Sequence, residues 1–147
     1  MNENIVRFIQ KQTCATLCCV DEQGKPWCFS CYYAFNSMEG LLYFKSSPAS
    51  HHSSIMKKNL LIAGTILPDK LNKLLVKGIQ FEGTVLDAKD PSMNKASGFY
   101  HNKFLLAQAM PGEISVIRID HIKMTDSTLG FGKKNSWSRL NEQLIPN

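Results

Sequence analysis

The order of apolar and polar positions along the chain predicts a mainly β protein that begins with a helix. Residues 3–12 repeat their apolar positions at helical spacing, and the asparagines beside them can cap a helix. Residues 13–20 and 26–35 are rich in β-branched, aromatic and cysteine residues, and the segment DEQGK between them is typical of a hairpin turn. A second hairpin is predicted where NSMEG leads into the apolar segment LLYFKS.

In the middle of the chain, the spacing of the apolar residues changes twice between the helical and the strand pattern. Residues 48–59 show a helical pattern, after which LLIAGTI predicts a strand, so the chain makes a strand, helix, strand crossover. The segment LPDKLNKL predicts a loop or a helical turn. In LVKGIQFEGTVLDA the residues alternate, with Ile79, Phe81 and Val85 on one side and polar residues on the other. One face of this strand should therefore pack in the core, while the other can meet a ligand or a partner.

The last third of the chain is predicted to hold a helix, two strands and a tail. Asp90 can cap a helix that starts at Pro91 and ends near residue 103. The segments EISVIRI and HIKMTDS predict two strands, and a tail with glycine, lysine and tryptophan follows over residues 128–147. About six strands with short hairpins, and helices outside the sheet order, predict a small antiparallel barrel that forms one domain over residues 1–147.

Composition and charge narrow the classes of function. The chain has 147 residues, of which 44% are hydrophobic, and this is enough to build a core. Its net charge is +5, but the lysines are scattered, so we expect a mild preference for anionic ligands and no nucleic-acid partner. The N-terminus carries charges within its apolar pattern, and no eighteen apolar residues run together, so neither a signal peptide nor a membrane span is predicted. We therefore expect a cytoplasmic protein.

All five cysteines lie in the first quarter of the chain, at positions 14, 18, 19, 28 and 31. An odd number of thiols on two adjacent predicted strands favours reduced, buried cysteines. Zinc knuckles place CxxC on a tight turn, whereas WCFSCYYAF predicts a strand on which Cys28 and Cys31 face opposite sides, so we expect no metal site. A thiol on a strand also shows neither a lowered pKa nor a placed base, which argues against Cys31 as a nucleophile.

The segment KSSPASHHSS, residues 45–54, carries the candidate site. Here the chain leaves a strand and enters a helix, where backbone N–H groups and serine hydroxyls can bind a phosphate and Lys45 can supply positive charge. The alternative is that a serine only caps the helix while the histidines face solvent. Metal binding by His51 and His52 is disfavoured, because neighbouring helical residues point about 100° apart.

Several segments in this order resemble a known family. PWCFSCYYAF, LLYFKSSPASHHSSIMKKN, IAGTI and KGIQFEG are similar to the FMN-binding split barrels related to pyridoxamine 5'-phosphate oxidase. The C-terminal IRIDHIKMTDSTLGFGKKNSWSR resembles one branch of that superfamily more closely, the YhbP-like proteins. The resemblance implies a six-stranded antiparallel split β-barrel that forms a homodimer, with two FMN sites at the subunit interface.

The resemblance also implies which residues hold the cofactor. The strand CFSCYY would lie along the isoalloxazine, chiefly through backbone groups, and the serine-rich turn would take the phosphate. Gln80 resembles polar residues that approach the flavin in relatives, although a plain exposed glutamine explains it equally. The implied cofactor-binding residues in these three places are Phe29, Ser30, Cys31, Tyr32, Lys45, Ser46, Ser50, His51, His52 and Gln80.

The tail offers further candidates. GFGKK places Lys133 and Lys134 beside flexible glycines, and Trp137 offers a flat ring, so these residues could close over a cofactor or an anionic substrate in an interfacial site. An ordinary surface tail with one packed tryptophan is the alternative.

Two departures from the family pattern shape the predicted function. Many relatives carry an Arg-Lys pair where this chain has His51 and His52, which predicts a weaker phosphate clamp that depends on pH. The chain also shows no convincing match to the substrate-binding arginine and histidine of the true oxidase, so oxidation of pyridoxamine phosphate is not expected.

The predicted function is therefore FMN binding. If the protein is catalytic, the flavin would transfer hydride or electrons from a reduced nicotinamide to an unidentified acceptor. The alternative is a non-catalytic module that binds flavin, haem or another small anion for storage or sensing, with haem suggested by the two imidazoles. A structural dimer with a vestigial pocket is a third possibility.

Overall fold

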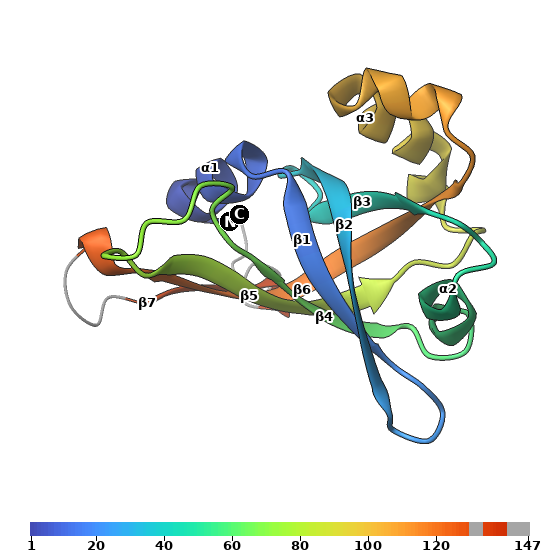
Figure 1. Ribbon diagram of the computed structural model, residues 1–147, viewed down its shortest axis with the longest axis horizontal. Coiled ribbons are helices and arrows are strands. Elements are labelled where there is room, and N and C mark those ends of the chain that lie inside the picture. The colour runs from blue at the N-terminus through green and yellow to red at the C-terminus, as the bar shows by residue number, and fades with distance from the viewer. Residues whose placement is uncertain (130–133, 141–147) are drawn as a thin grey trace.

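Antiparallel strands form the framework of the computed structural model, which describes residues 1–129 and 134–140 (Figure 1). The strands pair in the order β3-β2-β1-β4-β5-β6-β7, and β3 also pairs with β6. The strands are β1 (Cys14–Val20), β2 (Pro26–Asn36), β3 (Leu41–Ser46), β4 (Leu61–Ile66), β5 (Lys77–Val85), β6 (Glu113–Asp126) and β7 (Lys134–Ser138).

The pairing of β3 with β6 closes the first six strands into a barrel. β7 pairs only with the far end of β6 and so extends the sheet outside the closed ring. The prediction of a six-stranded antiparallel barrel is therefore confirmed. Closure leaves no edge on most strands, which protects them from pairing with other chains.

Short helices lie around the barrel. None of the helices in the described residues is long and apolar enough to cross a membrane. The helices are α1 (Glu3–Lys11), α2 (His51–Met56) and α3 (Ala96–Lys103), and the 3₁₀ turns are η1 (Pro91–Lys95), η2 (Leu105–Ala109) and η3 (Ser127–Leu129).

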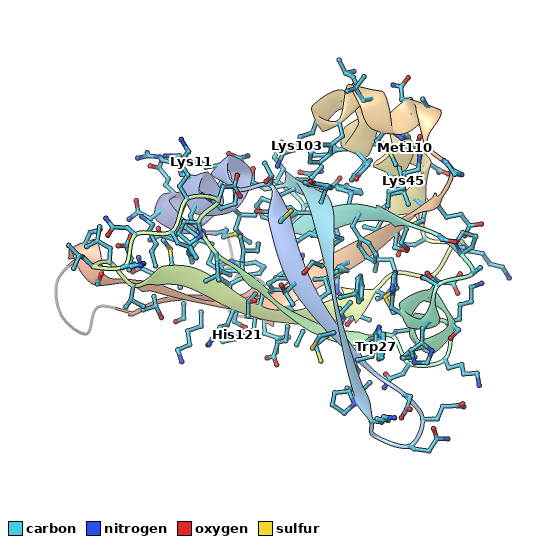
Figure 2. The ribbon with its side chains drawn as sticks, in the orientation of Figure 1. Lys11, Trp27, Lys45, Lys103, Met110 and His121 are labelled. Carbon is cyan, nitrogen blue, oxygen red and sulfur yellow. The ribbon has the colours of Figure 1, made fainter. Side chains whose placement is uncertain are left out.

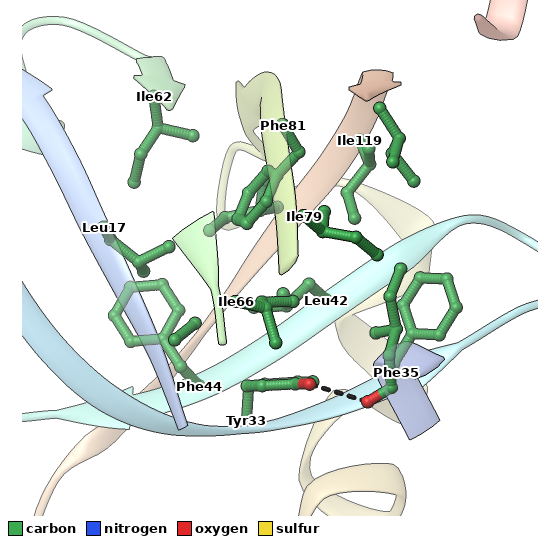
Figure 3. Close-up of a cluster of buried hydrophobic side chains, with 14 of the residues drawn as sticks. Leu17, Tyr33, Phe35, Leu42, Phe44, Ile62, Ile66, Ile79, Phe81 and Ile119 are labelled. Carbon is green, nitrogen blue, oxygen red and sulfur yellow. Dashed lines mark hydrogen bonds between the residues drawn. The ribbon is translucent and has the colours of Figure 1, made fainter. Parts of the chain in front are cut away.

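The core fills the barrel and extends under α1. The inward side chains of the strands pack together (Figure 3). The helix α1 adds Ile5, Phe8 and Ile9 to this core, as its helical spacing predicts. The Tyr33 hydroxyl, which is buried in this core, donates a 2.6 Å hydrogen bond to the carbonyl oxygen of Ile9. Burial raises the pKa of Tyr33, so its hydroxyl stays protonated as a donor that ties α1 to β2.

Two predictions about the C-terminal third were wrong. The segments predicted as two strands form the single strand β6, because no glycine or proline separates them. Glu82 faces His121 whereas Gly83 faces Ile119, so Asp120 is an extra residue that forms a bulge. Within the described part of the predicted tail, Lys134–Ser138 forms β7, which pairs with β6 between residues 121 and 125.

The predicted helices agree better with the structure than the predicted C-terminal strands do. α1 begins after Asn2, whose side chain accepts a 2.8 Å hydrogen bond from the backbone N–H of Asn4. Asp90 caps the η1–α3 segment by accepting from the N–H of Ser92 at 2.9 Å, also as predicted. α2 is shorter than the helical pattern predicted over residues 48–59, and the 3₁₀ turn η2 was not predicted.

Candidate functional site

The strand β2 has one open edge over most of its length. Its residues 26–32 pair with β1, but only residues 33–36 pair with β3. Beyond that point β3 stays with β6 and leaves β2. Within residues 1–129 and 134–140, no strand covers the second edge of residues 26–32. The barrel is therefore split here, and backbone polar groups on this edge need another partner.

The register shows which backbone groups face the open edge. The Tyr33 N–H donates to the carbonyl oxygen of Thr13, the residue just before β1. Successive residues of a strand direct their backbone groups to alternate sides. The N–H and C=O groups of Cys28, Ser30 and Tyr32 therefore point away from β1, toward the split. Two of the four residues predicted along a flavin ring, Ser30 and Tyr32, thus offer backbone groups there.

A cavity of about 620 Å³ lies beside the end of this edge. Its walls include Tyr32, Lys45 and Ser46, which are three of the predicted residues, together with Tyr100 and Phe104 of the α3 region and apolar side chains of residues 105–111. The volume falls within the range of about 300–1,000 Å³ that is typical of small-molecule sites. The wall formed by residues 100–111 was not predicted, although the apolar segment FLLAQAM was its visible signal.

Lys45 joins the two walls of the cavity (Figure 2). Its ammonium donates to the carbonyl oxygens of Ala107 at 2.8 Å and Met110 at 2.7 Å, and lies 3.5 Å from Nε2 of His101. These contacts tie the η2 segment to the end of β3. They also place a positive charge at the cavity, where an anionic ligand could compete with the carbonyl oxygens.

The serines of the predicted phosphate turn bond mainly to one another. Ser50 accepts from the N–H of Ser53 at 3.3 Å, so it caps α2, and its hydroxyl lies 2.9 Å from Nε2 of His52. The buried Ser53 hydroxyl donates to the carbonyl oxygen of Ser47 at 2.9 Å and lies 3.3 Å from the Ser46 hydroxyl. Ser53 is thus the centre of the turn, although it was not among the predicted residues. Its signal was its position three residues after Ser50, the N-cap of α2, where its side chain lies beside the capping hydroxyl.

The two histidines hold α2 against the open half of β2. The His52 ring stacks on Phe29 at 3.8 Å between centroids and 9° between planes, while His51 meets Trp27 edge-on at 4.8 Å. Burial, with a contribution from neighbouring His51, lowers the pKa of His52. His52 therefore adds no positive charge at neutral pH, and a phosphate clamp made by it is not favoured.

The other predicted strand residues are spread over two faces. Ser30 lies on the outer face, 3.3 Å from the Thr16 hydroxyl, whereas Cys31 packs against the core. Burial raises the pKa of Cys31 to about 12, which agrees with an inert thiol. Gln80 is exposed on the outer face of β5, opposite Thr65 of β4 and Lys123 of β6, and does not line the cavity.

Of the three predicted tail residues, Trp137 is the one whose side chain is described, and it does not line the cavity. Trp137 is only 9% exposed and packs in the main core from β7, and its indole nitrogen has no hydrogen-bond partner within the described residues. The guanidinium of Arg139 lies 5.4 Å from this ring. Lys133 lies outside the described residues, and the structure gives only the backbone of Lys134, at the start of β7.

Comparisons with known proteins identify relatives over nearly the whole chain. No family model matches. A UPF0306 protein of Yersinia enterocolitica is 34% identical over 139 residues, which cover 95% of this chain and 94% of that protein. The UPF0306 protein YhbP of Escherichia fergusonii is 32% identical over 135 residues, which cover 92% of this chain and 91% of that protein.

Solved structures with the same split-barrel fold include proteins described as binding haem or a flavin. A haem-binding protein from Mycobacterium smegmatis matches with a TM-score of 0.73 and 14% identity, over 89% of this chain but only 55% of that one. An FAD-binding protein from Mesorhizobium loti matches with a TM-score of 0.69 and 14% identity, over 84% and 90%. HutZ, a haem storage protein from Vibrio cholerae, matches with a TM-score of 0.61 and 15% identity, over 79% and 86%. These low identities establish the fold alone.

Proposed function

Because this chain belongs to the UPF0306 family and folds as a split barrel, we propose that it binds FMN beside the open edge of β2. The observation that carries the proposal is the backbone groups of Cys28, Ser30 and Tyr32 facing a split that leads to the cavity. A flavin ring carries carbonyl oxygens and an N–H along one edge, and unpaired strand groups are suitable partners for them.

The residues around the cavity suit the remaining parts of FMN. Tyr32, Tyr100 and Phe104 form an aromatic group, with ring centroids 5.8 Å apart for Tyr32–Phe104 and 5.1 Å for Tyr100–Phe104, which can pack on a planar ring. Lys45 and Ser46 offer a cation and a hydroxyl to the phosphate. Ser50, His51 and His52 would act indirectly, by holding α2 beside the site. In this role the bound flavin supplies hydride or electron transfer, and the protein orients it.

A second copy of the chain is expected to complete the site. The mouth of the cavity exposes large apolar side chains, with exposed fractions of 59% for Tyr32, 69% for Leu105 and 90% for Leu106. Clusters of exposed apolar side chains mark interaction surfaces in soluble proteins. We therefore infer a homodimer, and a purely monomeric protein in analytical ultracentrifugation would contradict this part of the proposal.

Titration with FMN tests the cofactor directly. Flavin fluorescence should be quenched as FMN binds the wild-type protein, and Phe104→Ala should weaken binding by about 3- to 10-fold through the loss of one aromatic contact. Phe99→Ala is the matched control, because Phe99 is a phenylalanine of the neighbouring helix α3 that does not line this cavity. Unchanged fluorescence with the wild-type protein would exclude FMN. If FMN binds, oxidation of NADH or NADPH by the complex would distinguish a flavin-dependent oxidoreductase from a carrier.

Haem is the second candidate, since two of the similar structures are described as haem proteins. In this chain His101 lies next to the cavity through its contact with Lys45, and a neutral imidazole is a good iron ligand. Added haem should then give a Soret band that shifts in His101→Ala but not in His121→Ala, whose imidazole lies on β6 near Glu82. A band that is the same in both variants would remove His101 as a ligand and leave flavin as the favoured cofactor.

A further inference from the structure

The hairpin of β1 and β2 places Cys18 directly opposite Cys28. Thr13 and Tyr33 are also directly opposite and share a backbone hydrogen bond. Pairs along an antiparallel ladder alternate between hydrogen-bonded and non-hydrogen-bonded types. Cys18 and Cys28 lie five positions from that pair, an odd number, so they form a non-hydrogen-bonded pair.

This pair type brings side chains closest together. Its Cα atoms lie about 4.5 Å apart, a separation within the range of about 4.4–6.8 Å that disulfides span. Both thiols are free, Cys28 is exposed and Cys18 is partly exposed. The two thiols are close enough to hydrogen bond to each other, and burial followed by this contact raises the pKa of Cys18. The prediction of buried cysteines was therefore wrong for Cys14 and Cys28, which are exposed, and Cys18 is only partly buried.

The other three cysteines cannot compete for this bond. Cys14 is exposed on the same face, but it lies four residues from Cys18, about 13 Å along the strand, and is opposite Tyr32. Cys19 and Cys31 belong to the inner face, where both contact the core. All five cysteines are described residues, so Cys18 and Cys28 are the one directly opposite pair of thiols among them.

We propose that Cys18 and Cys28 form a reversible disulfide when the protein meets a low-molecular-weight disulfide such as oxidised glutathione. The thiolate of exposed Cys28 attacks one sulfur of that disulfide, which breaks its S–S bond, forms a mixed disulfide and releases one thiolate. The Cys18 thiolate then attacks the Cys28 sulfur and releases the second thiolate. The two protein thiols lose two protons and two electrons, and the small disulfide takes them up as two thiols.

This modification would act next to the proposed cofactor site but does not depend on it. Cys28 is one of the residues whose backbone groups face the open edge of β2, so a bond to Cys18 fixes that edge against β1. An exposed disulfide is also readily reduced, which suits a reversible modification.

The test counts thiols in the full chain after incubation with oxidised glutathione, acid quenching and alkylation in denaturant. Mass spectrometry should show that two of the five cysteines are no longer alkylated and that no glutathione is attached to the protein. Cleavage after Glu22 separates the strands, so a cross-linked pair of peptides locates the bond. Cys14→Ser is the matched control and should behave as the wild type. Cys18→Ser should instead accumulate the mixed disulfide on Cys28, and Cys28→Ser should form no internal bond.

Three outcomes would overturn the proposal: five thiols that all survive, an internal bond that persists in Cys18→Ser, or a bond between two chains on a non-reducing gel. None of these readouts requires flavin or haem. A failure of cofactor binding therefore leaves the thiol result interpretable, and the reverse also holds.

Discussion

Replacing Lys45 by methionine should loosen one wall of the cavity while leaving the barrel folded. The change removes two hydrogen bonds from a charged donor, at 2.8 Å to the Ala107 carbonyl oxygen and 2.7 Å to that of Met110. Such bonds are each worth about 1.5–3 kcal/mol when buried. Because Lys45 is half-exposed and water can replace it, we expect a loss of about 1–2 kcal/mol in the docking of the η2 segment.

Hydrogen exchange measures this docking at single amides. The Met110 N–H donates to Ala107 and the Ala107 N–H donates to Phe104, so both amides report on the segment. The expected loss corresponds to exchange that is about 5- to 30-fold faster at these amides in Lys45→Met. Lys89→Met, which changes an exposed lysine of a loop, is the control and should leave them unchanged. Equal exchange in both variants would refute the inference that Lys45 holds this wall.

The same variant separates two roles of Lys45 in cofactor binding. If the ammonium binds the phosphate, Lys45→Met should weaken FMN at least tenfold more than riboflavin, which lacks the phosphate. If it only holds the wall, both ligands should weaken by the same factor. Equal weakening would therefore remove Lys45 from the proposed phosphate ligands while keeping the cavity itself.

Two further variants test the barrel. A Cβ at Gly64 would lie 2.5 Å from the ring of Phe81, so Gly64→Val should lower the free energy of unfolding by about 3 kcal/mol in urea titrations, whereas Ala63→Val, on the outer face, should change it by less than about 0.5 kcal/mol. Burial opposes ionisation of Asp126, but hydrogen bonds from Lys77, 2.6 Å away, and from a threonine outweigh it and hold its pKa below the ordinary 3.8. This ion pair should stabilise the fold above that pH and lose its effect as the pH falls through the lowered pKa. Asp126→Asn should therefore cost about 1–3 kcal/mol at pH 7 and progressively less as the pH falls below 3.8, and a cost that does not change with pH would contradict the assignment.

The sequence by itself determined the local elements. The helix cap at Asn2 acts within one turn, and the alternation of Ile79 and Phe81 on β5 sets which face is buried, so both are visible in a short window of residues. The same holds for the hairpins, where Gly24 and Gly40 adopt φ angles of +82° and +64° that other residues rarely take. These features were predicted because their causes lie between near neighbours in the chain.

The residue types of the candidate site are visible in the sequence but their orientation is not, because side-chain partners come from distant segments. The serines of the turn were expected to face a phosphate, but Ser53 gathers their hydroxyls into one internal network. His52 was expected to clamp an anion, but Phe29, more than twenty residues earlier, stacks on its ring. A spacing pattern gives the donors in a turn, while only the packed neighbours decide where those donors point.

Tertiary structure alone decided the features that make a site possible. The open edge of β2 exists because β3 leaves it to pair with β6, whose residues lie about 70 positions later in the sequence. The cavity wall comes from residues 100–111, which Lys45 holds from across the fold. The paired thiols of Cys18 and Cys28 follow from the register of one hairpin. Each of these depends on which segments meet in space, and the hydrogen bonds and packing that bring them together act between residues that no local pattern connects.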